Sequence, residues 1–239
     1  MKKLLSIIIP VYNERQNIKE LVTRIENALK DNNYEIIFVD DSNDETTNII
    51  MSLAKQDDKV KLIHREGKKG LSSAVIEGFK MARGDVFAVM DGDLQHPPEI
   101  MPIMLSKINE GADIVIPSRF IEGGSDGGLN LFRKLVSGTA RYMGKLLFKK
   151  LRKVSDPTSG IFMLKKSIIN DKKLSDIGWK ILIEILVMGD YNNLVEIPYG
   201  FDTRNSGESK MNAFVQAQYL KHLLSLILRT KFNINRNNY

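Results

Sequence analysis

Short apolar runs alternate with stretches of helical spacing through the first half of the chain, and this alternation limits the possible folds more than any other feature. The runs cover residues 4–11, 35–39, 60–63 and 86–90 and read as buried strands. Between them, as in residues 16–30, apolar residues recur at the spacing of a helix with one buried face. Strands that alternate with helices indicate an α/β fold with a mainly parallel, twisted sheet flanked by helices, joined by right-handed crossovers.

Polar residues stand where the predicted strands end. If the strand order is 3-2-1-4, the connections reverse direction between the first and fourth strands, and a ligand crevice opens at their carboxyl ends. This order brings Tyr12, Glu14, Asp41, Asp91 and Asp93 to one crevice. The chain has no glycine-rich dinucleotide fingerprint and no phosphate-loop lysine motif, so hydride transfer and NTP hydrolysis are weak interpretations.

Two carboxylates one residue apart follow the fourth run, in the stretch DVFAVMDGDLQHPPE. Residues i and i+2 of an extended segment face the same way, so Asp91 and Asp93 can point at one small volume. Gly92 removes a side chain where a ligand comes close, and Gln95 adds a neutral oxygen. Hard oxygen ligands suit Mg²⁺ or Mn²⁺, which take one or two carboxylates and complete their shell with phosphates and water. DGD is also a common turn signal, but the preceding strand and the QHPPE extension favour a metal site holding a nucleotide diphosphate.

The net charge of +6 and the pI near 9.3 favour anionic partners, which are nucleic acid, phosphate-bearing substrates or a membrane surface. Residues 129–154 hold eight lysines and arginines and no acid, and their apolar residues can share one broad face. We predict a basic amphipathic helix that lies on lipid headgroups, the alternative being a solvated face. Nucleic-acid binding would require aromatics interleaved with the basic residues, and the segment offers few on a leucine-rich background.

The remaining composition narrows the chemistry. The absence of cysteine excludes disulfides, zinc thiolate sites and cysteine nucleophiles. No stretch reaches the roughly 18 uninterrupted apolar residues of a membrane span, and the first six residues show no leader pattern. We therefore expect a soluble or peripheral protein.

The second half continues the strand and helix pattern, without a clear domain boundary. We predict helices over 98–109, 177–188 and 213–228. Further strands are expected at 113–117, 161–164 and 194–197.

We expect Glu184, the one acid of its apolar helix, to meet a buried partner. Ser42 and Glu45 fit a capping box at the start of a helix, and Asp41 can either bind a ligand or begin that turn. The chain is predicted to be one domain over 1–239, with a nucleotide half at 1–117 and an acceptor half at 118–239.

These motifs together resemble glycosyltransferase family 2 and, within it, the polyprenyl-phosphate (dolichyl-phosphate) mannose synthases. The resemblance covers nearly the whole chain and is carried by IIPVYNE, VDDSND, GLSSAVIEGF, MDGDLQHPPE, SRF, the segment 133–137, DPTSGIF, KILIEIL and GESK. It implies a GT-A fold, a GDP-mannose donor, a divalent cation (Mg²⁺ or Mn²⁺) and a polyprenyl or dolichyl phosphate acceptor at the cytoplasmic face of a membrane. Many relatives continue into carboxyl-terminal membrane spans, so we expect a peripheral form, a shortened chain or one with a membrane-protein partner. A homodimer through the last helix is also open.

The resemblance also implies a role for individual residues. The nucleoside would contact Pro10, Tyr12, Glu14, Val39 and Asp41. Metal and diphosphate would be held by Asp91, Asp93 and Gln95, beside Gly92, where relatives often carry alanine. The acceptor phosphate would meet Arg119, Arg133 and Ser137, with Arg204 and Lys210 closing over both anions. The residues expected to be catalytic are Asp93, Arg119 and Arg133.

A lipid phosphate acceptor makes a general base unnecessary. Its second pKa lies near 6, so the attacking oxygen is already anionic at neutral pH. The acceptor phosphate and the donor diphosphate are both anions and repel each other. For two unit charges about 4 Å apart this repulsion is roughly 4 kcal/mol at an effective dielectric constant of 20, so cations must offset it. We predict direct displacement with inversion at the anomeric carbon. The alternatives are a UDP-sugar-dependent polyprenyl-phosphate transferase (glucose or similar) and a non-catalytic, membrane-associated nucleotide-binding protein.

Overall fold

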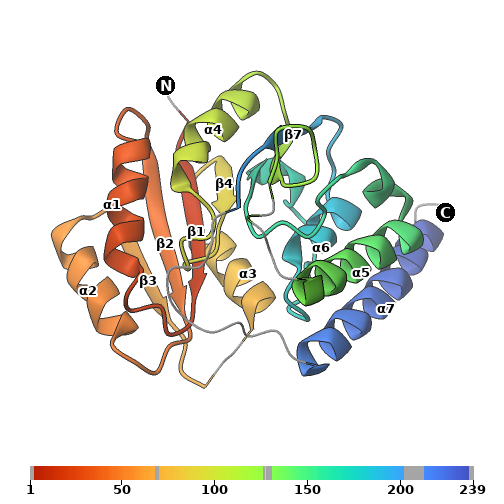
Figure 1. Ribbon diagram of the computed structural model, residues 1–239, viewed down its shortest axis with the longest axis horizontal. Helices are drawn as coiled ribbons and strands as arrows, with labels where there is room; N and C mark the ends of the chain where they lie inside the picture. The colour runs from red at the N-terminus through yellow and green to blue at the C-terminus, as the bar shows by residue number, and fades with distance from the viewer. Residues whose placement is uncertain (1–2, 68–69, 126, 128–130, 202–212, 237–239) are drawn as a thin grey trace.

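The computed structural model describes residues 3–67, 70–125, 127, 131–201 and 213–236 (Figure 1). Within these, residues 131–137, 140, 213–217 and 231–236 are described by their backbone alone. The strands are β1 Leu5–Val11, β2 Tyr34–Asp40, β3 Val60–His64, β4 Val86–Val89, β5 Ile114–Ser118, β6 Phe162–Lys165 and β7 Leu194–Pro198. The α-helices are α1 Ile18–Ala28, α2 Thr46–Gln56, α3 Leu71–Met81, α4 Met101–Asn109, α5 Leu131–Leu147, α6 Ile181–Met188 and α7 Ala213–Arg236. Short 3₁₀ helices are η1 Pro98–Ile100, η2 Lys149–Lys153 and η3 Lys166–Ile168.

The described strands form one seven-stranded sheet with the order β3-β2-β1-β4-β6-β5-β7. The order 3-2-1-4 that was assumed for the first four strands is the observed one, and β1 pairs in parallel with both β2 and β4. β6 lies between β4 and β5 and runs antiparallel to both, so the sheet is mixed but mainly parallel, as predicted. The switch in direction at β1 leaves a crevice at the carboxyl ends of β1, β2 and β4.

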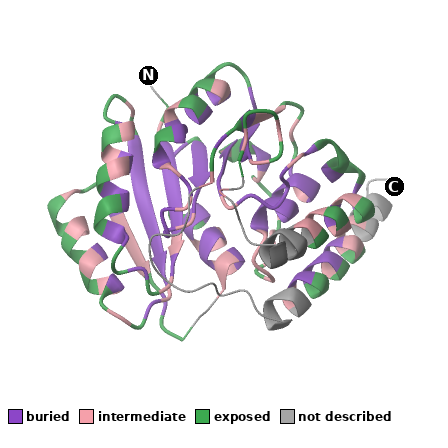
Figure 2. Cartoon of the chain, in the orientation of Figure 1, coloured by how far each residue is buried: buried purple, intermediate pink, exposed green. Residues whose placement is uncertain are grey.

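Helices cover both faces of the sheet, and the alternation of side chains along β1 shows how two cores arise. Ile7 and Ile9 pack in a first core with the buried faces of α1, α2 and α4. Ile8 points the other way, into a second core formed with α3, η2, α6 and α7. Figure 2 shows the result as a buried sheet between helices whose outer faces are exposed. The core therefore fixes β1, β2 and β4, whose ends carry the polar residues.

The predicted helix over 129–154 is wrong at its end, because α5 stops at Leu147. Phe148 takes extended backbone angles (φ −123°, ψ 117°), and a 3₁₀ turn follows. Phe148 and Leu151 are both buried in the second core. A straight continuation of α5 does not turn the chain into that core, so burial of these two side chains ends the helix.

The predicted helix over 177–188 begins late. Gly178 has a φ of +90°, which lies outside the helical region and favours glycine. α6 starts only at Ile181, after Lys180 as its N-cap residue. The residues before it, Gly178 and Trp179, are thereby released from the helix and line a cavity described below.

No helix within the described ranges combines the length and the apolar composition that crossing a bilayer requires.

A buried carboxylate at the amino ends of the strands makes stability depend on pH. Glu35 is 1% exposed and accepts hydrogen bonds from Ser6 Oγ (2.6 Å), Lys61 Nζ (2.5 Å) and the Arg83 backbone N–H (2.8 Å). Burial alone raises the pKa of this carboxyl, but the hydrogen bonds from Lys61, Ser6 and Arg83 outweigh it and lower the pKa from 4.5 to about 2. A lowered pKa in the folded state stabilises the fold above pH 4.5, and this contribution is lost as the pH falls towards 2.

We expect Glu35→Gln to remove about 3 kcal/mol of this pH-dependent stability. Urea unfolding of the wild type and the variant between pH 5 and pH 2 measures it, with the exposed Glu122→Gln as control. The free energy of unfolding should change less with pH in Glu35→Gln than in the wild type and the control. The same pH dependence in all three proteins would contradict the lowered pKa of Glu35.

Candidate active site

A cavity of about 510 Å³ opens at the carboxyl ends of β1, β2 and β4. The residues predicted from the sequence that line it are Pro10, Tyr12, Glu14, Asp41, Asp91, Gly92 and Asp93. The structure adds Val11, Gly70, Leu71, Ala74, Gly178, Trp179 and Gln218. The prediction of a shared crevice is confirmed. Its wall from the second half of the chain was missed, because residues this distant in sequence meet only through the tertiary fold.

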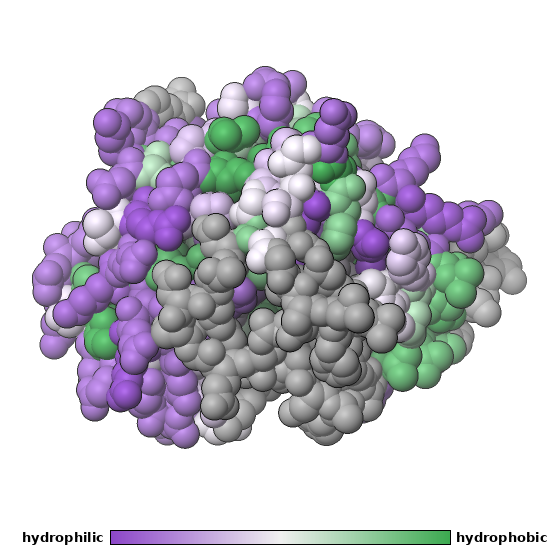
Figure 3. All heavy atoms as spheres, viewed as in Figure 1, coloured by the Kyte–Doolittle hydropathy of each residue, from purple (hydrophilic) through white to green (hydrophobic). Residues whose placement is uncertain are grey.

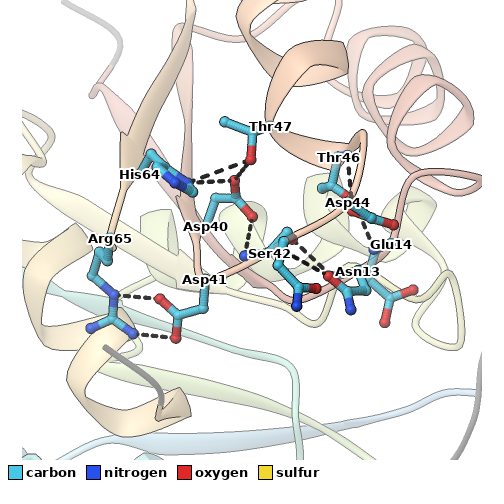
Figure 4. A network of polar contacts seen from close by, with 11 residues as sticks. Asn13, Glu14, Asp40, Asp41, Ser42, Asp44, Thr46, Thr47, His64 and Arg65 are labelled. Atoms are coloured by element: carbon cyan, nitrogen blue, oxygen red, sulfur yellow. Dashed lines mark hydrogen bonds and ion pairs between the residues drawn. The ribbon is translucent and has the colours of Figure 1, made fainter. Parts of the chain in front are cut away.

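The carboxylate of Asp41 is oriented by an arginine that the sequence did not single out (Figure 4). Arg65 Nε and Nη2 bond the two oxygens of Asp41 at 2.7 and 2.6 Å. Arg65 also donates to the Gly70 carbonyl and to Ser73 Oγ, and its side chain is only 2% exposed. Asp41 therefore reaches the cavity already paired with a cation and held in one direction.

The loop after β1 is fastened to the loop after β2, as Figure 4 also shows. The Asn13 N–H donates to Ser42 Oγ (2.8 Å), and the Glu14 N–H donates to Thr46 Oγ1 (3.0 Å). α2 starts at Thr46 without a side-chain cap, so the predicted Ser42–Glu45 capping box is wrong. Ser42 is used across the loops instead. The side chain of Glu14 is buried and accepts from Asn17 Nδ2 (2.8 Å), which fixes it at the cavity edge.

The two DGD carboxylates come directly after β4. Asp93 is 8% exposed, and its Oδ1 accepts from the Gln95 N–H at 3.2 Å. Asp91 lies 3.6 Å from Nε2 of the buried His96, whose Nδ1 is 3.1 Å from the Tyr199 hydroxyl. Both carboxylates line the same cavity, as the i, i+2 spacing predicted.

This donor set fits a divalent cation of the Mg²⁺ or Mn²⁺ type. Among the residues that the structure describes, no group of three or more histidine, aspartate and glutamate side chains is placed to hold a metal. Two carboxylates that line one cavity are nevertheless the protein share that such ions take, with phosphate oxygens and water as the remaining ligands.

Gly160 makes room for the Asp91 carboxylate. A Cβ at this position would lie 2.5 Å from Asp91 Oδ2 and 2.7 Å from His96 Nε2. The glycine of the DPTSG segment is therefore required by close approach, and the segment is more than the simple turn that the sequence indicated.

We expect Gly160→Ala to displace the Asp91 carboxylate and to lower turnover about 10²-fold, since a shift of about 1 Å at a site can have that effect. Gly200→Ala is the matched control, because a Cβ there meets nothing within 4 Å. Steady-state kinetics of the two variants is the measurement. Equal turnover of Gly160→Ala and the wild type would show that the position of Asp91 is not critical.

The predicted acceptor residues are only partly described. Arg119, at the end of β5, pairs through Nε and Nη2 with the buried Asp156 at 2.8 and 3.1 Å. Arg133 and Ser137 lie on α5, where the backbone alone is described. Arg204 and Lys210 lie outside the described residues. Asp156 is a further residue that sequence reasoning did not select.

Two other predicted residues, Val39 and Gln95, are not among the residues that line the cavity. Val39 is fully buried and packs in the second core with Ile8 and Ala74. Gln95 is partly buried next to Asp93. The described geometry thus collects the predicted carboxylates and the residues after β1 and leaves the acceptor contacts as predictions.

An open, mainly parallel α/β sheet flanked by helices on both faces is the architecture of the GT-A fold, and solved structures share it. The crystal structure of glucosyl-3-phosphoglycerate synthase from Mycobacterium tuberculosis with Mn²⁺, UDP-glucose and phosphoglyceric acid matches with a TM-score of 0.72. The match covers 94% of this chain and 80% of that chain at 17% sequence identity. The complex of the same enzyme with UDP has a TM-score of 0.71. The predicted fold is confirmed.

The chain belongs to glycosyltransferase family 2, since residues 6–171 match the sequence profile described as "Glycosyl transferase family 2". Similar proteins named dolichol-phosphate mannosyltransferase come from three organisms. The Pyrococcus furiosus protein is 48% identical over 93% of this chain and 63% of its own length. Those of Mycosarcoma maydis and Saccharomyces cerevisiae are 36% and 37% identical, over 92% and 96% of this chain and 78% and 89% of their own. The chain therefore spans less than two thirds of the Pyrococcus protein, and the resemblance found in the motifs is confirmed.

Proposed function

We propose that this chain is an inverting glycosyltransferase that moves mannose from GDP-mannose to a dolichyl or polyprenyl phosphate. The observation that carries the proposal is the pair Asp91 and Asp93, which meet at one cavity of about 510 Å³ at the sheet's switch point. The names of the relatives at 36–48% identity support the sugar and the acceptor. In this scheme residues 1–117 form the donor half and residues 118–239 the acceptor half of one domain.

The donor would lie across the ends of β1, β2 and β4. Tyr12, Glu14 and Asp41 line the cavity and would contact the nucleoside. Asp91 and Asp93, with Gln95 beside them, would hold a divalent cation and the diphosphate. The bound cation supplies Lewis-acid stabilisation of the departing diphosphate.

The acceptor would approach from the side of Arg119. An acceptor phosphate oxygen forms the new bond to the anomeric carbon as the bond to the diphosphate breaks, and the nucleoside diphosphate leaves with the electron pair. Because the acceptor oxygen is already anionic, no side-chain base takes a proton. Arg119, Arg133, Arg204 and Lys210 would offset the repulsion between the two anions.

The surface of α5 and α7 supports a location on a membrane, which we place at its cytoplasmic face. The two helices are in contact, and their exposed apolar side chains are Tyr142, Leu146, Leu147, Leu220, Leu224 and Leu228. Figure 3 shows hydrophobic atoms gathered at the right of the view, where these helices lie in Figure 1. The exposed cations Lys149, Arg152, Lys153 and Lys221 lie on or next to the same helices. Leucines flanked by cations suit the headgroup region of an anionic bilayer.

We expect Leu146→Glu and Leu224→Glu each to weaken binding to anionic vesicles at least about tenfold, because burying one leucine contributes about 1.5–3 kcal/mol. These leucines are 75% and 64% exposed. Ile103→Glu on α4, where the side chain is 54% exposed, is the matched control. Vesicle co-sedimentation is the measurement. If all three variants bind as the wild type does, this face does not contact lipid.

The proposed reaction is tested by supplying the protein with Mg²⁺ or Mn²⁺, a panel of nucleotide sugars and a short-chain polyprenyl phosphate. Mass spectrometry identifies the glycolipid, and calorimetry ranks the nucleotides. Mannosyl phospholipid from GDP-mannose is the expected product. If the product is instead a glucosyl lipid made from UDP-glucose, the proposed donor and sugar are wrong, but the class of reaction is right. Binding of nucleotide without any transfer would overturn the proposed catalysis.

A further inference from the structure

A second, smaller cavity of about 90 Å³ adjoins the first. Leu71, Asp91 and Trp179 line both, so the two spaces meet at the predicted metal ligand Asp91. The smaller one is walled by Gly160 and by the start of α6, including Lys180. It lies where the donor and the acceptor of the proposed reaction would come together.

Lys180 brings a cation into this small cavity. Its ammonium donates to the Thr158 carbonyl at 2.5 Å and lies 4.2 Å from the centre of the Trp179 ring. Both are neutral groups. Trp179 and the backbone of Thr158 therefore hold the ammonium in place and leave its charge uncompensated by direct contact within the described part of the chain.

The surroundings of Lys180 are unfavourable for a cation. Burial lowers the pKa of the ammonium to about 8, and repulsion by Arg119 adds to this, against attraction from Asp91 and Asp156. Asp156 itself accepts hydrogen bonds from Nε and Nη2 of Arg119. Lys180 is also the N-cap residue of α6, where the helix dipole disfavours positive charge.

Lys150 belongs to η2 and reaches the carboxyl end of the same helix, where burial lowers the pKa of its ammonium as well, against attraction from Asp190. The Lys150 ammonium donates to the carbonyls of Val187 and Gly189 at 3.0 and 3.1 Å. A cation at a helix carboxyl terminus is favoured by the dipole and satisfies carbonyls that lack partners in the helix. Lys150 is thus explained by the stability of α6, whereas Lys180 is not.

We propose that Lys180 is a further catalytic residue, whose ammonium binds the incoming phosphate oxyanion where it meets the donor, between Asp91 and Arg119. The inference rests on the proposed function and adds a residue to it. An anion in the small cavity would relieve the repulsion between Lys180 and Arg119 and compensate the charge at the start of α6. Lys180 keeps its proton throughout and acts by charge alone.

The test compares Lys180→Met, which keeps the length of the side chain and removes its charge, with Lys180→Arg and the matched control Lys150→Met. For Lys180→Met we expect kcat/KM for the polyprenyl phosphate to fall about 10²-fold, with GDP affinity in calorimetry unchanged. Its Tm should equal or exceed that of the wild type, since a disfavoured cation is removed. Lys180→Arg should recover part of the rate. Lys150→Met should keep the rate and lower the Tm.

The outcomes separate this inference from the proposed function. If the wild type is active and Lys180→Met turns over equally well, or loses Tm as Lys150→Met does, the role of Lys180 is overturned while the proposed function stands. If the wild type transfers no sugar, the proposed function fails. Lys180 is then judged by calorimetric titration of a short-chain polyprenyl phosphate, where weaker binding by Lys180→Met supports the inference and equal binding overturns it.

Discussion

Asp91→Asn and Asp93→Asn are each expected to lower the rate of sugar transfer at least about 10³-fold without unfolding the protein. Asparagine has nearly the same shape as aspartate, so the packing after β4 is kept. It lacks the negative charge that a divalent cation requires from a site with two carboxylates. The expected loss is therefore one of cation binding, and the nucleoside contacts proposed for Tyr12 and Glu14 should remain.

Two measurements check this expectation. The first is the transfer rate at saturating metal, with the exposed Asp58→Asn as control. The second is removal of metal by a chelator, which should abolish activity in the wild type until Mg²⁺ or Mn²⁺ is restored. Wild-type rates in both variants, or full activity in chelator, would refute a metal-dependent mechanism at this turn.

The second large effect is expected at Glu184, the buried acid of α6. Its Oε2 lies 2.6 Å from His222 Nε2, and its Oε1 accepts from the Ser175 N–H at 2.9 Å and pairs with Arg229. Glu184 and His222 are both fully buried. Burial raises the pKa of this carboxyl, but the bonds from His222, Arg229 and Ser175 outweigh it and hold the pKa below its usual range. The predicted buried partner of Glu184 is confirmed, and the network ties α7 to α6.

We expect Glu184→Ala to lower the free energy of unfolding by about 3–5 kcal/mol, because it leaves the partners of a buried carboxylate without their acceptor. Glu184→Gln should lose less, since the amide retains one acceptor oxygen. Urea unfolding at neutral pH measures both. A loss below about 1 kcal/mol for the alanine variant would place Glu184 among ordinary surface pairs.

Much of the first half of the sheet and of its cavity could be derived from the sequence. Neighbouring apolar residues make up most of each strand from β1 to β4, and the turn after β4 carries its two acids within three positions. Such signals need only a short window of chain and one known periodicity. The order of these strands was an assumption, taken from doubly wound sheets. The family resemblance used the same local motifs.

Only the tertiary structure decided what those residues pair with. It inserted β6 antiparallel between β4 and β5, joined Asp41 to Arg65 across 24 positions, and joined Arg119 to Asp156 across 37. It also placed Lys180 at the start of α6 and brought the ammonium of Lys150 to the carbonyls at the end of that helix. Local periodicity fixes which face of an element is buried, but the partner of a buried charge depends on how distant elements pack, and the sequence pattern carries no comparable short-range signal for that.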